Sequence, residues 1–178
     1  MAAGLTDKLW GWEEVIALID SKQEAPKRRS PTGRRRFEPM PFDLSQLHRL
    51  MVGHDESIQV GMIEDRVMKR IGWRLPYVYL HRKYCLKILK DHPDITPIEP
   101  LRLPIAVMKG ELILEQNRRA LDACYTDPEN KKSYLAVLKR AVSSDDHEIW
   151  VSSFYRLENR KHLKLRREGT IVREHAKN

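Results

Sequence analysis

The sequence predicts an α+β fold in which N-terminal helices are followed by a four-stranded antiparallel sheet. Two observations lead to this class. Apolar residues recur mostly at helical spacing up to about residue 110, and short β-branched and aromatic runs separated by polar turns follow. The regular alternation of strands and helices that builds a parallel sheet is missing. We therefore expect a largely helical first part and an antiparallel second part.

The composition is that of one ordinary domain with an appendage. Of 178 residues, 41% are hydrophobic and 33% are charged, so the chain can bury a core and keep a charged surface. No apolar run approaches the roughly 18–20 residues that a membrane span requires. The first residues also lack the features of a signal peptide. We expect a cytoplasmic protein that does not contact a membrane.

The cysteines point to neither a disulfide framework nor a metal site. Cys85 and Cys124 are too few and too far apart for either, and no Cys/His run has the spacing of a zinc site. We expect two buried, reduced thiols, no metal and no cofactor. The net charge of +8 instead favours a polyanionic partner, and RNA is our first candidate.

The first 26 residues predict a helical appendage. Residues 9–20 have helical spacing, with Trp12, Val15 and Ile16 on one face. A helix of this length does not fold alone, so it either docks on another part of the protein or frays.

Residues 27–41 predict a disordered linker. The stretch KRRSPTGRRR at 27–36 holds six basic residues and no acidic one. It would act either as a phosphate-binding arm or as a solvated tether, and the sequence leaves both open. The remaining residues, 42–178, are expected to form the main domain, with its core in residues 77–174.

The first part of this domain predicts short helices and one strand. Residues 42–71 are rich in apolar residues that Gly53 and Gly61 interrupt, which favours two short helices. Residues 77–80 are β-branched and aromatic, typical of a short strand. A helix is expected at residues 82–90.

Proline and glycine set the next boundaries. Pro93 disfavours a helical residue before it, so the preceding helix should end at residues 91–92. A second helix, shortened or kinked by its prolines, is expected from Thr96 to Gly110.

The antiparallel sheet is expected after this helix. Runs of β-forming residues alternate with polar turns. The four strands are predicted at residues 111–115, 120–125, 133–142 and 148–154, and residues 163–165 are a candidate edge strand.

One resemblance concerns the N-terminal appendage. Residues 2–29, AAGLTDKLWGWEEVIALIDSKQEAPKRR, resemble the C-terminal tail of bacterial insertion-sequence transposases. In those proteins the tail follows the catalytic core, and the acidic catalytic triad lies upstream of it. The resemblance implies a remnant or a fused start that has no transposase activity of its own.

A second resemblance covers residues 77–174. The segments YVYLHRKYCLKILKDHPDI, SYLAVLKRAV and HEIWVSSFYR resemble phage-type members of the barnase–EndoU–colicin–RelE-like nuclease superfamily. The resemblance implies a metal-independent ribonuclease fold, often used as a toxin or a phage-borne effector. Members of the family commonly carry a second histidine where this chain has Ile88.

The chemistry of such a ribonuclease points to His92. Cleavage without a metal needs a base for the 2′-hydroxyl, an acid for the leaving oxygen, and donors around the phosphate. Imidazole is the natural proton carrier near neutral pH. Lys87 lies on the same helix but about 140° away around a regular helix, so the two would converge only if the helix end unwinds.

Strand residues would supply the remaining contacts. Strict alternation places Trp150, Ser152 and Phe154 on one face, and Val151, Ser153 and Tyr155 on the other. The expected catalytic residues are His92, Lys87 and Ser153, and the expected phosphate- and RNA-binding residues are Lys139, Arg156, Tyr155, His81 and Arg82.

Three alternatives to an endoribonuclease remain. The first is a catalytically inactive nucleic-acid-binding module. The second is a protein-interaction module, such as a toxin-like domain held by an inhibitor (an antitoxin or immunity protein). The third is a vestigial product of a mobile element. Under these readings His92 would simply cap its helix and Lys87 would be a solvated charge.

Overall fold

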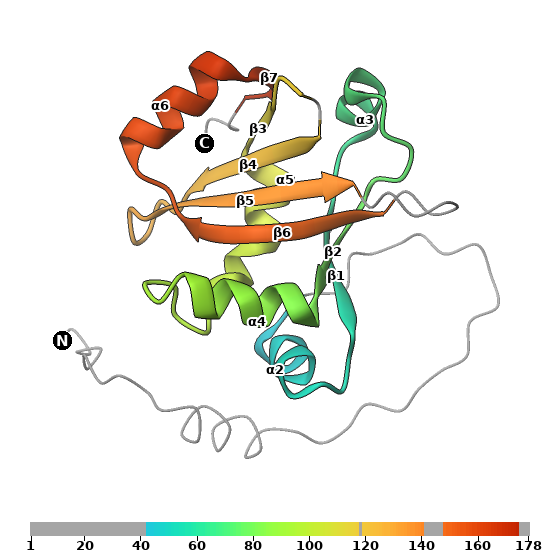
Figure 1. The fold of residues 1–178 in the computed structure, drawn as a ribbon, viewed down its shortest axis with the longest axis vertical. Coiled ribbons are helices and arrows are strands. Elements are labelled where there is room, and N and C mark those ends of the chain that lie inside the picture. Colours follow the sequence, from blue (N-terminus) through green and yellow to red (C-terminus); the bar gives the residue numbers. More distant parts are fainter. Residues whose placement is uncertain (1–41, 118, 141–147, 175–178) are drawn as a thin grey trace. The chain divides into compact units, whose positions relative to one another are not determined.

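A seven-stranded mixed sheet organises the part of the chain that the computed structural model describes, residues 42–117, 119–140 and 148–174 (Figure 1). Five α-helices and one short 3-10 helix accompany the sheet within these residues. All of them belong to one compact unit. The helix expected in residues 1–26 and the basic linker expected in residues 27–41 lie outside the described residues.

The elements follow one another with short connections. In chain order they are α2 (Leu44–Val52), β1 (Ser57–Met62), α3 (Asp65–Ile71), β2 (Tyr77–His81), α4 (Arg82–Asp91), η1 (Glu99–Arg102), α5 (Leu103–Lys109), β3 (Glu111–Leu114), β4 (Ala120–Thr126), β5 (Ser133–Arg140), β6 (Ile149–Arg156), α6 (Asn159–Glu168) and β7 (Thr170–Arg173).

The prediction of a four-stranded antiparallel sheet is wrong. The strand order is β1-β2-β6-β5-β4-β3-β7, so the expected meander β3 to β6 forms only the middle of a larger sheet. Strand β7 extends the sheet beside β3, and β2 and β1 extend it beside β6. Strand β2 runs parallel to β6, pairing Val78 with Ile149, which makes the sheet mixed.

Two of the additional strands were expected elsewhere or not at all. Strand β1 falls in a region predicted to be helical, although Ile58, Val60 and Met62 repeat with the period of two that a strand requires. The candidate edge strand at residues 163–165 lies inside α6, and β7, which follows that helix, forms the edge of the sheet beside β3. The helix expected between Thr96 and Gly110 begins with the 3-10 helix η1 before α5.

The main core fills one face of the sheet. Helices α2, α3, α4 and α5 contribute to it together with alternate residues of the strands. Helix α5 crosses β1 at Gly61, where an added Cβ would lie 2.9 Å from the Val107 Cγ1. The largest fully buried side chains of the main core include Tyr134, Phe154, Leu47, Leu50, Leu80, Leu103, Leu112, Leu121 and Leu138.

A smaller core lies on the other face of the sheet. It contains Ile113, Cys124 and Leu135 from three adjacent strands, with Leu165 of α6 packed against them. Both faces of the sheet are therefore covered in part. Among the helices of the described ranges, none has the length and apolarity needed to cross a membrane.

Candidate functional site

The end of α4 places His92 beside β6. The helix ends where Pro93 disfavours a further helical residue, and His92 has left the helical conformation, with φ −125° and ψ 75°. Its backbone N–H still donates to the Ile88 carbonyl at 3.0 Å. Helix α4 runs beside β6 (Figure 1), so the side chain that follows its last turn reaches that strand.

Three of the predicted site residues meet at this point. The His92 Nε2 and Ser153 Oγ atoms lie 3.4 Å apart, a long hydrogen bond. The imidazole also stacks on the Tyr155 ring, with the ring centroids 5.0 Å apart and the planes inclined by 28°. Helix α6 adds Lys161, whose Nζ lies 4.3 Å from the centroid of the Tyr155 ring. We call these four residues, His92, Ser153, Tyr155 and Lys161, the His92 cluster.

A bulge in β6 determines which side chains share the face of the cluster. Val137 of β5 pairs with Ser153 and Leu138 pairs with Val151, so Ser152 is an extra residue in β6. The Ser152 hydroxyl donates to the Val137 carbonyl at 3.0 Å. Beyond the bulge the alternation is shifted, and Trp150 shares a face with Ser153. The strict alternation expected from the sequence is therefore wrong for Trp150, and also for Val151, which lies in the main core with Phe154.

The same face carries Asp122. The register pairs Asp122 of β4 with Val137, and Val137 with Ser153, so the three residues form one row across neighbouring strands. With strands about 4.8 Å apart, the Asp122 and Ser153 backbones are about 10 Å apart. Lys161 is electrostatically coupled to Asp122 and contacts Tyr155, so it links this carboxyl to the His92 cluster.

The environment of Asp122 favours a proton on its carboxyl. Burial, assisted by Glu115, raises its pKa to about 7, while the ammonium groups of Lys161 and Lys139 lower it. Within the described residues its carboxylate oxygens accept no hydrogen bond. Asp122 therefore exchanges a proton close to neutral pH.

Arg156 lies away from the cluster. It pairs with Tyr134 across β5 and points to the main-core face, opposite Ser153 and Tyr155. Its Nη2 donates to both Glu99 oxygens, at 3.0 and 3.1 Å. Glu99 also accepts from the Tyr134 hydroxyl at 2.9 Å and the Lys132 ammonium at 3.2 Å. The Arg156 guanidinium is therefore engaged by a buried carboxylate.

The other predicted residues are dispersed. Lys139 is exposed on β5, opposite Trp150, and reaches the neighbourhood of Asp122 only electrostatically. Lys87 is exposed on α4, with its Nζ 4.0 Å from the Asp91 carboxylate. The structure records no contact between Lys87 and His92 among the described residues.

His81 and Arg82 act at the start of α4. The His81 Nδ1 caps the helix by accepting from the Lys83 backbone N–H at 3.3 Å. Its ring also contacts the edge of Trp150, with centroids 5.5 Å apart. The Arg82 Nε donates to the Met51 carbonyl at 3.3 Å and so ties α4 to α2.

A second polar cluster lies under α6. The His162 Nε2 and Glu111 Oε2 atoms are 2.6 Å apart, and the Arg166 Nε lies 3.3 Å from Glu111 Oε1. Donor atoms of Glu111, Cys124 and His162 all lie within 4.8 Å of one another. Burial, with Asp122 and Glu111, raises the pKa of the Cys124 thiol, so it stays protonated. With Arg166 on the carboxylate, this cluster fits a structural ion pair better than a metal site.

Sequence reasoning did not find Asp122 or Lys161. The signal for Asp122 was one acidic residue inside the otherwise apolar strand ALDACYT. A buried acid in such a strand calls for an explanation, because carboxylates are rarely buried without a partner. Lys161 was noticed only as one member of a run of basic residues, an RNA track or a solvated face, and nothing in that run singles out the residue that reaches the cluster.

No protein-family model, curated protein or solved structure matches the chain.

Proposed function

We propose that the chain is a metal-independent endoribonuclease-like phosphodiesterase and that the His92 cluster is its site. The observation that carries the proposal is the convergence of His92, Ser153 and Tyr155 from two segments far apart in the sequence. An imidazole beside a hydroxyl and an ammonium group is a set of side chains suited to phosphate chemistry without a metal.

The proposed reaction begins at the 2′-hydroxyl of RNA. His92 takes the proton from this hydroxyl, and the oxygen attacks the adjacent phosphorus. The bond from phosphorus to the 5′-oxygen of the next nucleotide then breaks, which yields a 2′,3′-cyclic phosphate. The departing 5′-oxygen takes a proton from the exposed Lys161 ammonium. Asp122, which is buried and coupled to Lys161, then returns a proton to this amine, since its pKa of about 7 keeps part of the population protonated at neutral pH.

The other residues of the cluster stabilise and orient. Lys161 and the Ser153 hydroxyl face the negative charge that develops on the phosphate. Tyr155 already contacts both His92 and Lys161, so we assign it to holding the imidazole and the ammonium rather than to stacking on a base.

A non-catalytic nucleic-acid-binding module is the second candidate. The observation that favours it is the burial of Ile88, which is 3% exposed and packed in the main core. The position that commonly holds a second histidine in the resembled superfamily therefore faces away from solvent. In this case the basic surface would bind RNA, with an affinity that falls steeply as salt concentration rises.

The resemblance to toxins and phage-borne effectors suggests a role as a mobile-element effector. An inhibitor protein, such as an antitoxin or immunity protein, is then a further candidate partner. Cytoplasmic residence, where RNA is abundant, is part of the same proposal.

The experiment that tests the function compares two histidines. The full chain, His92→Ala and His54→Ala are each incubated with labelled total RNA in excess chelator. His54 is exposed and lies outside the cluster, so its variant controls for the loss of an imidazole. We expect cleavage by the wild type and by His54→Ala, and none by His92→Ala.

The other outcomes separate the candidates. Equal cleavage by all three proteins would remove His92 from the mechanism. If all three proteins leave the RNA intact and bind it with an affinity that falls as salt concentration rises, the protein is the non-catalytic nucleic-acid-binding module and not a phosphodiesterase.

A further inference from the structure

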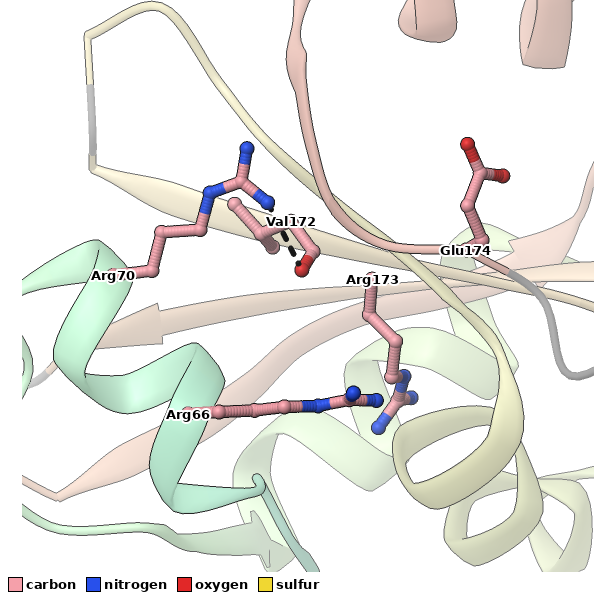
Figure 2. A pocket seen from close by; sticks show the side chains of 5 residues that line it. All are labelled: Arg66, Arg70, Val172, Arg173 and Glu174. Carbon is pink, nitrogen blue, oxygen red and sulfur yellow. Dashed lines mark hydrogen bonds between the residues drawn. The ribbon is translucent and has the colours of Figure 1, made fainter.

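A concave region lies near the end of the sheet that carries β7, away from β6 and the His92 cluster. Arg66 and Arg70 of α3, together with Val172, Arg173 and Glu174, line a cavity of about 450 Å³ (Figure 2). We call these five residues the arginine pocket. None of them belongs to the His92 cluster.

Arg173 provides a fixed cation at the base of this pocket. It is 7% exposed, and its Nη2 donates to the Val107 and Gly110 carbonyls at 2.6 and 2.7 Å. Its Nη1 also lies 3.4 Å from a carboxylate oxygen of Glu64. Burial lowers the pKa of Arg173, Glu64 raises it and Arg66 lowers it further. These contacts hold the guanidinium in one position beside α3.

The charges around the pocket do not balance. Glu64 serves two arginines, since it also accepts from the Arg66 Nε at 2.5 Å. Glu174 is paired with Arg166 at 3.3 Å, and its carboxylate points away from the three guanidinium groups in Figure 2. Arg166 also pairs with Glu111, so it does not fully neutralise Glu174. Three guanidinium charges thus face two carboxylates, which leaves an excess of one positive charge.

Two of the arginines keep unused donors. Arg70 uses its Nη1 for the Val172 carbonyl at 3.4 Å, and Arg66 uses its Nε for Glu64. The structure records no acceptor for their other N–H groups among the described residues. A guanidinium group presents N–H donors in a planar fork that matches two oxygens of a phosphate.

We propose that the arginine pocket binds a terminal phosphate group, carried either by a small phosphorylated molecule or by the end of a nucleic acid. A terminal phosphate carries close to two negative charges at neutral pH and presents three oxygens to the unused N–H groups of Arg66 and Arg70. A phosphodiester carries one negative charge and presents only two such oxygens, so it would engage fewer of these N–H groups. The proposal does not depend on the function proposed for the His92 cluster.

Calorimetric titration of the full chain with inorganic phosphate tests the site, with chloride at equal ionic strength as reference. Arg66→Gln/Arg70→Gln removes two exposed cations that line the pocket. Lys69→Gln/Arg74→Gln removes two exposed cations from the same stretch that do not line it. We expect saturable binding that is at least about tenfold weaker in the first double variant and unchanged in the second.

A 5′-phosphorylated oligodeoxynucleotide and its 5′-hydroxyl form distinguish the source of the phosphate. Tighter binding of the phosphorylated oligodeoxynucleotide than of both inorganic phosphate and the 5′-hydroxyl form would identify a nucleic-acid end. Equal binding of the two oligodeoxynucleotides, with saturable binding of inorganic phosphate, would identify a small phosphorylated molecule. Either result supports the site.

A readout without variants covers the case in which a double variant does not fold. Phosphate is predicted to slow the modification of Arg66 and Arg70 by phenylglyoxal, measured by mass spectrometry, and to leave that of Arg74 unchanged. Binding no stronger than that of chloride, equal loss in both double variants, or no protection of Arg66 and Arg70 would overturn the proposal.

Discussion

The pKa values of two buried carboxyl groups on opposite faces of the sheet are shifted in opposite directions. Glu99 and Asp122 are 7% and 3% exposed, so burial penalises the charge of both. Burial raises the pKa of Glu99, but hydrogen bonds from Thr96, Tyr134, Lys132 and Arg156 outweigh it and hold the pKa below its usual value. Asp122 receives no such bonds within the described residues, and its pKa rises to about 7.

The difference shows what separates a structural charge from a reactive one in this protein. Glu99 is surrounded by donors, so it stays ionised and fastens η1 to the sheet. Asp122 is buried to a similar degree but interacts with cations only at longer range, so it remains able to exchange a proton. The number of donors on the carboxylate, and not its burial, therefore distinguishes the two sites.

Among the substitutions that test the difference between Glu99 and Asp122, Asp122→Asn should have the largest effect on stability. The folded-state pKa of about 7 lies above the unfolded value of about 3.9. The contribution of Asp122 to stability is therefore fully present below about pH 4 and is lost as pH rises through 7. As pH rises from about 4 to above 7, the free energy of unfolding of Asp122→Asn should increase by on the order of 4 kcal/mol relative to that of the wild type.

Urea unfolding from pH 4 to pH 8 measures this difference. Asp65→Asn, at an exposed position of α3, is the matched control for the loss of one carboxylate. Parallel curves for the wild type and Asp122→Asn would contradict the raised pKa.

Glu99→Gln should lower stability at neutral pH. The amide cannot accept as many hydrogen bonds, and it leaves Lys132 without its counter-charge and Arg156 with Asp94 alone, 4.0 Å away. We expect a loss of about 2–3 kcal/mol, below the usual range for a broken buried pair because both cations remain partly exposed. Chemical denaturation at pH 7 measures it, with the exposed Glu129→Gln as control. A change below about 0.5 kcal/mol would show that the Glu99 network is not stabilising.

Acid should weaken the contribution of Glu99 and strengthen that of Asp122. The folded-state pKa of Glu99 is lowered, so its contribution to stability is present above the unfolded value and is lost as pH falls through the folded-state pKa. The stability difference between the wild type and Glu99→Gln should therefore shrink on acidification from about pH 5. A difference that grows in acid would reverse the assigned direction.

Single charges near Asp122 should give the smallest and most specific effects. Lys161→Gln removes a charge that lowers the pKa of Asp122 and should raise that pKa by less than about one unit. Glu115→Gln removes a charge that raises it and should lower it. Carbon-detected NMR titration of the Asp122 carboxyl measures both changes. Shifts of the same sign in the two variants would exclude direct electrostatic coupling.

Part of the candidate site could be predicted from the sequence because its residues carry local signals. His92 precedes a proline at a helix end, and Ser153 and Tyr155 alternate within one strand beyond the bulge. Their convergence depends on α4 lying beside β6, a non-local contact that residue spacing does not encode. Lys87 was expected to join them and instead stays beside Asp91.

The sheet shows the same limit. Strands β3 to β6 are adjacent in sequence and were recognisable from their turns. The parallel pairing of β2 with β6 joins segments separated by about half of the domain, and no local pattern reports it. The bulge at Ser152 was also invisible, since an extra residue in a strand changes the pairing and not the composition.

Cleavage of an oligodeoxynucleotide that contains a single ribonucleotide tests the central claim most directly. The full chain is incubated with this substrate in excess chelator, beside an all-deoxy control and the His92→Ala variant. The proposed mechanism predicts a cut only after the ribonucleotide, a 2′,3′-cyclic phosphate on the product, and no cut by His92→Ala. An uncut substrate, an equal cut in the all-deoxy control, or full activity of His92→Ala would contradict it.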